Sequence, residues 1–141
     1  MATISLMVDI QEGSHGIDCA ADCIRRGGVA VLPTETVYGL FGRTNDASAI
    51  AHIYALKGRP NNNPLIAHVL DQASAKTLAA EWPKSADAIC DAFWPGPLTI
   101  VVPRHPSVLP QAVGGFNSIA IRSPQHPITR AVLAVVREPL S

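Results

Sequence analysis

PTETVYGL, residues 33–40, is a polar turn set between two apolar runs, residues 29–32 and 40–41. A buried strand that ends in proline, two hydroxyls and a carboxylate adds little to a core, but it presents hydrogen-bonding groups well at the edge of a sheet. We therefore expect this turn to form one wall of a functional site. If the turn is extended, Thr34 and Thr36 point to opposite sides and only one of them faces that site.

Helical and strand patterns alternate along the chain on both sides of this turn. Apolar spacing, capping residues and glycine or proline breaks predict helices over residues 17–26, 46–57, 71–80, 85–93 and 127–137. Strands are predicted at residues 29–32, 65–70, 98–102 and 118–121. We expect Ile89 and Phe93 on the buried face of the fourth helix and Ile128 on that of the last. This order indicates one α/β domain with helices packed on a mixed sheet.

The last predicted helix would normally lead into a returning strand, and Pro139-Leu140-Ser141 has the pattern of its entry. The expected unit is therefore a single domain, residues 1–141, whose last strands are missing. The strand at residues 118–121 delivers Arg122 at its end, where α/β sheets usually place their ligand groups.

Composition favours a globular domain and argues against long-range electrostatic attraction to a strongly charged partner. The 141 residues are 48% hydrophobic, and 11 basic residues balance 11 acidic ones. No apolar run approaches the roughly 20 residues of a membrane span, and the start lacks a signal-peptide pattern, so we expect a cytoplasmic protein without membrane contact. The three cysteines, Cys19, Cys23 and Cys90, lack partners for a zinc site and are interpreted as reduced thiols.

Several polar residues could form a ligand site, and each has a simpler explanation. Lys57 and Arg59 lie where a helix ends, and cations there are favoured by the helix dipole by about 0.3 to 1 kcal/mol. His68 interrupts an apolar strand, where a histidine is more often a satisfied core residue than a ligand. Arg122 shifts the balance, because a guanidinium at a strand end can hold a carboxylate or phosphate through two parallel hydrogen bonds.

Several common chemistries are absent from the sequence. It contains no phosphate-binding loop of the Walker type, no dinucleotide glycine fingerprint, no nucleophile elbow and no zinc-ligand spacing. A protein of this kind would handle a nucleotide through a different set of loops.

Five motifs in one order resemble a known family. They are residues 33–40, Lys57-Gly58-Arg59-Pro60, Asn63-Pro64-Leu65 with His68, Trp94-Pro95-Gly96-Pro97-Leu98-Thr99, and Ile119-Ala120-Ile121-Arg122 with Pro124, His126 and Pro127. Together they resemble the YrdC-like family of L-threonylcarbamoyladenylate synthases, from about Cys19 to the end of the chain.

The resemblance implies a twisted α/β sheet around a concave, positively lined cavity. It also implies synthesis of threonylcarbamoyl-AMP and pyrophosphate from ATP, L-threonine and bicarbonate, with Mg²⁺ on the ATP, as a step toward threonylcarbamoyladenosine (t6A37) in tRNA. By motif, the residues near threonine would be Thr36, His68 and Arg122. Those that bind ATP would be Lys57, Arg59, Asn63 and Ser118. The resemblance assigns neither a catalytic residue nor a protein metal site.

Two alternatives remain open beside the synthase. A YrdC-like module could bind RNA or handle a carbamoyl adenylate without synthase activity, although a net charge of zero disfavours strong RNA binding. The chain could also be a fragment without function. Members of the family continue after a segment like Pro139-Leu140 into a Ser/Thr-x-Ser-Ala-Asn stretch, so activity of residues 1–141 alone stays open. Further partners would be tRNA or the downstream threonylcarbamoyl transferase.

Overall fold

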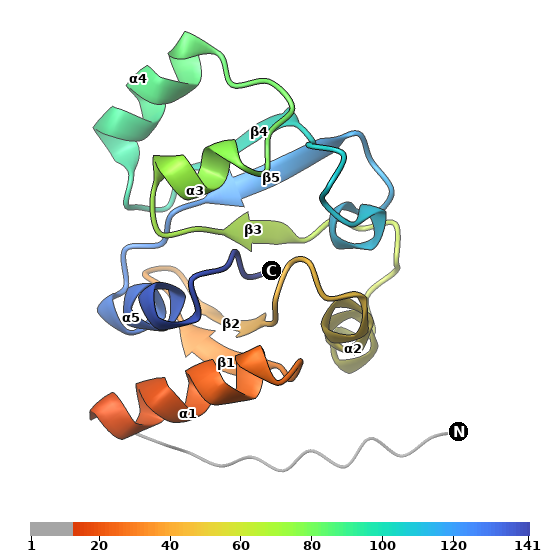
Figure 1. Ribbon diagram of the computed structural model, residues 1–141, viewed down its shortest axis with the longest axis vertical. Coiled ribbons are helices and arrows are strands. Elements are labelled where there is room, and N and C mark those ends of the chain that lie inside the picture. The colour runs from red at the N-terminus through yellow and green to blue at the C-terminus, as the bar shows by residue number, and fades with distance from the viewer. Residues whose placement is uncertain (1–12) are drawn as a thin grey trace.

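The computed structural model describes residues 13–141. In this part of the chain helices and strands alternate (Figure 1), in the order α1 (Gly13–Arg25), β1 (Ala30–Pro33), β2 (Tyr38–Phe41), α2 (Ala47–Lys57), β3 (Ile66–His68), α3 (Gln72–Lys76), α4 (Lys84–Phe93), β4 (Thr99–Pro103), the short 3-10 helix η1 (Pro110–Val113), β5 (Ser118–Arg122) and α5 (Pro127–Val136).

The strands form two small sheets. β1 and β2 make an antiparallel hairpin around the turn at residues 34–37. In the second sheet β5 lies in the middle, parallel to β3 and antiparallel to β4. The predicted α/β class with a mixed sheet is therefore confirmed.

The segment at residues 139–141 joins the two sheets, as Figure 1 shows between β2 and β3. On one side, the His68 N–H donates to the Leu140 carbonyl at 2.6 Å and the Leu140 N–H returns a bond of 3.0 Å. On the other side, the Ser141 N–H donates to the Gly42 carbonyl at 2.9 Å, and the hydroxyls of Ser141 and Thr44 lie 2.8 Å apart. The strand-like character expected for this segment is confirmed.

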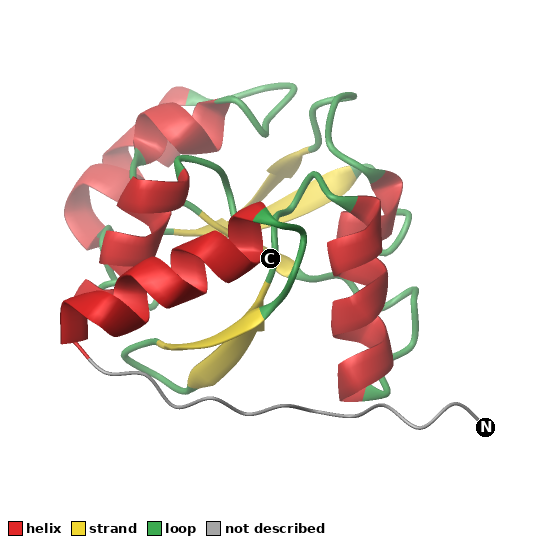
Figure 2. Cartoon of the chain, turned by 60° about the horizontal axis from the view of Figure 1, so that its bottom comes forward, coloured by secondary structure: helices red, strands yellow, loops and turns green. Residues whose placement is uncertain are grey.

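Three groups of buried apolar side chains hold the elements together. The largest packs one face of the β3-β5-β4 sheet, with Ala67 and Ile121, against α3. A second group fills the space between the hairpin, α1 and α5. The third lies under α2, which stands apart from α1 and α5 in Figure 2.

The predicted helix faces need two corrections. Ile89 is 42% exposed and Phe93 is 61% exposed, because α4 lies at the periphery of the molecule and packs through the short side chains of Ala86 and Cys90. Ile128 is 41% exposed as well, because the buried face of α5 is made by Thr129, Val132, Leu133 and Val136.

Several boundaries also differ from the prediction. β3 covers three residues and not six, because it pairs with β5 only over that length. Strand β2 and the helix η1 were not expected, since their residues have the composition of turns and loops.

Candidate functional site

One polar row crosses the β3-β5-β4 sheet at the end of β5. The register pairs Arg122 with His68 of β3 on one side and with Thr99 of β4 on the other. Paired residues in adjacent strands point to the same face of a sheet, so these three side chains lie side by side.

The face that carries this row is open, whereas the other face is core. Side chains alternate along a strand, which places Ser118, Ala120 and Arg122 on the open face and Ile121 on the core face. Val101 of β4, paired with Ala120, is 66% exposed. At about 3.3 Å per residue, Ser118 and Arg122 stand roughly 13 Å apart along β5. The row of polar groups thus lies at one end of this sheet face, next to an apolar and accessible part of it.

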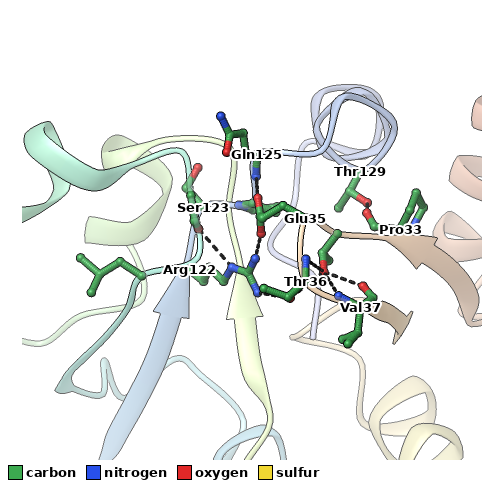
Figure 3. A network of polar contacts seen from close by, with 12 residues as sticks. Pro33, Glu35, Thr36, Val37, Arg122, Ser123, Gln125 and Thr129 are labelled. Carbon is green, nitrogen blue, oxygen red and sulfur yellow. Dashed lines mark hydrogen bonds and ion pairs between the residues drawn. The ribbon is translucent and has the colours of Figure 1, made fainter.

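Arg122 is the centre of the polar contacts in Figure 3 and is only 7% exposed. Its Nε donates to the Gly96 carbonyl at 3.1 Å, and Nη1 donates to the Thr36 hydroxyl at 3.3 Å. Nη2 forms an ion pair with the Glu35 carboxylate. Burial lowers the pKa of the guanidinium from its ordinary value. The adjacent carboxylate opposes that effect, and arginine stays charged at neutral pH.

The turn at residues 34–37 is folded and not extended. The Thr34 N–H donates to the Val37 carbonyl at 3.0 Å, and the Thr34 and Thr36 hydroxyls lie 3.1 Å apart. The expectation that these hydroxyls point to opposite sides is therefore wrong, because the chain reverses between them. Both belong to one network, and Thr36 extends it to Arg122.

Residues at the start of α5 hold this turn in place. The Gln125 N–H donates to Glu35 Oε2, and the Thr129 hydroxyl donates to the Pro33 carbonyl (Figure 3). The carboxylate therefore has one oxygen on the backbone of the α5 entrance and the other on Arg122. Sequence reasoning noted this carboxylate in the turn but assigned it no role. Its position beside Thr36 in the motif was the feature of the sequence that could have indicated a role for Glu35.

His68 is buried and uncharged at neutral pH. Its Nδ1 lies 3.1 Å from the Ile66 carbonyl, and its ring meets the Phe41 ring edge-on at 4.8 Å between centroids. Burial is the main cause that lowers its pKa to about 4, and the charge of Lys57 adds a smaller effect in the same direction. A carbonyl can only accept a hydrogen bond, so Nδ1 carries the proton and Nε2 is left as an acceptor.

The predicted ATP-binding residues at the end of α2 form a second group. Gly58 takes the left-handed conformation at φ +59° and ends the helix. Arg59 Nη2 then donates to the Asn63 side-chain oxygen at 3.0 Å and to the Pro64 carbonyl at 2.9 Å. Lys57 is exposed.

The structure thus brings the predicted residues together in part. In the first group Arg122 contacts Thr36 and lies next to His68. In the second group Arg59 contacts Asn63. Within residues 13–141 no hydrogen bond joins these two groups, and Ser118 lies at the other end of β5. A depression of about 440 Å³ lies between α2 and η1 and is lined by other residues. These residues are Ile50, Ala51, Tyr54, Asn61, Asn62, Pro110, Gln111, Gly114 and Gly115.

Two further properties concern metals and membranes. Residues 13–141 contain no group of three histidine, cysteine or acidic side chains that could hold a metal ion. No helix in the same part of the chain has the length and apolar character needed to span a bilayer. All three cysteines are free thiols, as predicted.

These features define a class of protein: an α/β domain that carries a buried arginine with polar neighbours at the end of a sheet strand. Comparison with known proteins narrows the class. A family model for Sua5, YciO and YrdC proteins, described as telomere recombination, matches residues 22–141. The chain belongs to this family.

Three relatives illustrate the match. The chain is 39% identical over 126 residues to the threonylcarbamoyl-AMP synthase of Pyrococcus abyssi, which covers 89% of this chain and 37% of the relative. It is 41% identical over 120 residues to that of Bacillus subtilis, covering 84% and 34%. A crystal structure of P. abyssi Sua5 complexed with L-threonine matches with a TM-score of 0.88 and 37% identity, over 93% of this chain and 38% of that one. The chain therefore spans little more than a third of these relatives.

Proposed function

We propose that the protein makes threonylcarbamoyl-AMP from L-threonine, bicarbonate and ATP and releases pyrophosphate. The observation that carries the proposal is the buried Arg122, whose guanidinium is held at the end of β5 next to Thr36 and His68. Such a group binds a carboxylate. The names of the P. abyssi and B. subtilis relatives support threonine as the amino acid.

In this proposal Arg122 binds the threonine carboxylate while Thr36 supports it. His68 lies beside Arg122 with Nε2 as a free acceptor, which suits the donor hydroxyl of the threonine side chain. A site that pairs a buried acceptor with a substrate hydroxyl strongly rejects analogues that lack the hydroxyl, because the acceptor is then left unpaired.

The second group of residues serves the nucleotide. Lys57 and Arg59 supply positive charge for the phosphates, Asn63 orients Arg59, and Ser118 contacts ATP from the far end of the open sheet face. The threonine amine and bicarbonate form a carbamate and water. A carbamate oxygen then attacks the α-phosphorus of ATP, and pyrophosphate leaves. This chemistry needs placement and charge neutralisation more than covalent help from the protein.

Magnesium would enter with ATP, bound to the nucleotide phosphates, whose charge it would help to neutralise. The product would serve the t6A37 modification of tRNA. Contact with tRNA or with the downstream transferase, and location in the cytoplasm, stay predictions.

The experiment is a pyrophosphate-release assay with the full-length protein, ATP, bicarbonate and magnesium. Release should require threonine, and turnover without threonine would contradict the proposal. Arg122→Ala should weaken threonine binding by about 2 to 5 kcal/mol, because a buried charged partner is removed. Arg26→Ala, which changes an exposed arginine directly after α1, serves as the control and should bind threonine normally. Unchanged calorimetric titration of Arg122→Ala would remove this residue from the site.

A further inference from the structure

Glu35 is the one strong charge beside Arg122 that the proposed function leaves without a role. Its side chain is 20% exposed, against 9% for that of Arg122. The carboxylate is therefore the more accessible member of the pair. Together the two groups present a negative and a positive charge next to each other, with a net charge of zero.

The contacts of Arg122 leave N–H groups without a hydrogen bond beside Glu35. A guanidinium has five N–H groups. Nε is taken by the Gly96 carbonyl and one N–H of Nη1 by Thr36. Nη2 is buried and pairs with the charge of Glu35, but it forms no hydrogen bond within residues 13–141. At least one N–H therefore remains unpaired on each terminal nitrogen. A ligand carboxylate that bonds to these groups comes to lie next to the Glu35 carboxylate.

Two adjacent carboxylates on one arginine repel each other unless a further positive charge lies near them. A free α-amino acid brings that charge, because its ammonium is attached to the same carbon as its carboxylate. The Arg122–Glu35 pair is thus complementary to a zwitterion.

We propose that Glu35 binds the α-ammonium of the amino acid whose carboxylate Arg122 holds, so that the pair selects free α-amino acids over other small acids. The proposal rests on the proposed function, since it concerns the same substrate. The anchor on the Gln125 N–H gives Glu35 a fixed position for this role. Once the ammonium has lost a proton to the solvent, the neutral amine would be presented in one orientation for carbamate formation.

The same ion pair has a second interpretation, which predicts the opposite result. Glu35 could act as an internal carboxylate that fills the place of the substrate carboxylate and must leave before the substrate binds. Removing its charge would then strengthen threonine binding. Under our proposal, removing the charge weakens it.

The experiment measures dissociation constants by calorimetry for two ligands, L-threonine and 2,3-dihydroxybutyrate, which carries a hydroxyl in place of the amine. Glu35→Gln should bind threonine about 10- to 100-fold more weakly than the unmodified protein, because a charge-assisted hydrogen bond is lost. Its affinity for the amine-free acid should be unchanged or higher, because one negative charge has left the site. Glu81→Gln, at an exposed acid after α3, is the matched control and should behave like the unmodified protein.

The outcomes separate the two proposals. If Glu35→Gln binds threonine as well as or better than the unmodified protein, the role of Glu35 is overturned and the threonine site stands. If the unmodified protein binds no threonine, the proposed function fails and this inference with it. If Arg122→Ala binds threonine normally, Arg122 is removed from the site and this inference is overturned as well. Glu35→Asp keeps the charge on a shorter side chain and should recover part of the threonine affinity. That partial recovery separates loss of charge from misfolding of the turn.

Discussion

The His68 imidazole is packed against the Phe41 ring and bonded to the Ile66 carbonyl, with only 9% of the residue exposed. A charge at this position would lose its hydration without gaining a carboxylate partner. The neutral form is favoured for that reason, and the nearby charge of Lys57 favours it further. A neutral ring with Nε2 as acceptor is also the form that suits a threonine hydroxyl. Stability and the proposed specificity therefore depend on the same protonation state.

This protonation state predicts how stability changes with pH. The pKa of His68 is lowered from 6.5 to about 4 in the folded protein. Between these values the unfolded chain binds a proton that the folded protein does not, so the free energy of unfolding falls as the pH falls from 6.5 toward 4. The contribution of His68 over the whole window is about 3 kcal/mol. Urea unfolding at pH 6.5 and 4.5 should show a loss of roughly 2 kcal/mol from this group.

Two histidine variants test whether His68 causes this loss of stability. His68→Asn should flatten the dependence, whereas His52→Asn, at an exposed position in α2, should keep it. The aspartates whose pKa is lowered, such as Asp46, have an ordinary value of 3.8, so most of their effect on stability falls below the window. Equal slopes for His68→Asn and the unmodified protein would show that His68 is not the titrating group.

For single residues, the sequence predicted most members of the candidate site but not the contacts between them. Arg122 was found because it follows an apolar strand, which is a local pattern. Glu35 was seen in the turn without a role, because its partner lies 87 positions away in the chain. The joint position of Thr34 and Thr36 could not be foreseen either, since it depends on the chain reversing within residues 34–37.

Among the elements, α2 shows best how a short segment places functional groups. Asp46 caps its start by accepting the Ala49 N–H at 3.1 Å, and its carboxylate also pairs with Arg43 at 2.8 Å. Both contacts lower the pKa of Asp46. At the other end Gly58 turns the chain so that Arg59 reaches Asn63. Both ends were predicted correctly, because capping depends on residues close in sequence.

Replacing Gly58 tests whether backbone conformation alone sets this end. Its φ of +59° is unfavourable for a side chain, yet an added Cβ would have no atom within 4 Å. Gly58→Ala should therefore lower the free energy of unfolding by about 1 kcal/mol through strain without a clash. Gly58→Asn should cost less, because asparagine tolerates the left-handed region. Urea unfolding compares the two, and equal losses would mean that contacts rather than φ decide the cost.

Elements whose position depends on distant partners were predicted less well. β2 has the composition of a turn followed by two apolar residues, and only pairing with β1 makes it a strand. The exposed side of α4 was misjudged, because the sequence does not reveal that short side chains contact the rest of the domain. The register between β3 and β5, which places His68 beside Arg122, is a long-range property of the same kind.

On the scale of the whole molecule, the two sheets are joined by one short segment. Residues 139–141 bond to Gly42 on one side and to His68 on the other, so the hairpin with the Glu35 turn is fixed relative to the sheet that carries Arg122. The entrance of α5 adds a second link through Gln125 and Thr129. The candidate site lies between these links, and its geometry therefore depends on both sheets keeping their relative position.

Leu140 is the residue through which this dependence can be measured. Its side chain is fully buried among α1, α5 and the hairpin, while its backbone pairs with His68. Leu140→Ala should lower the free energy of unfolding by about 2 to 5 kcal/mol, because it removes apolar contact and leaves a cavity where the two sheets meet. Val101→Ala, at a position 66% exposed on the open sheet face, is the control and should change it by less than about 0.5 kcal/mol. Because the turn and Arg122 belong to different sheets, Leu140→Ala should also weaken threonine binding, although within residues 13–141 Leu140 forms hydrogen bonds to His68 and none to Glu35 or Arg122. Calorimetry at a temperature where the variant remains folded measures this effect. Normal affinity in a clearly destabilised Leu140→Ala variant would show that the site keeps its geometry without the joining segment, and the links through α5 would then suffice.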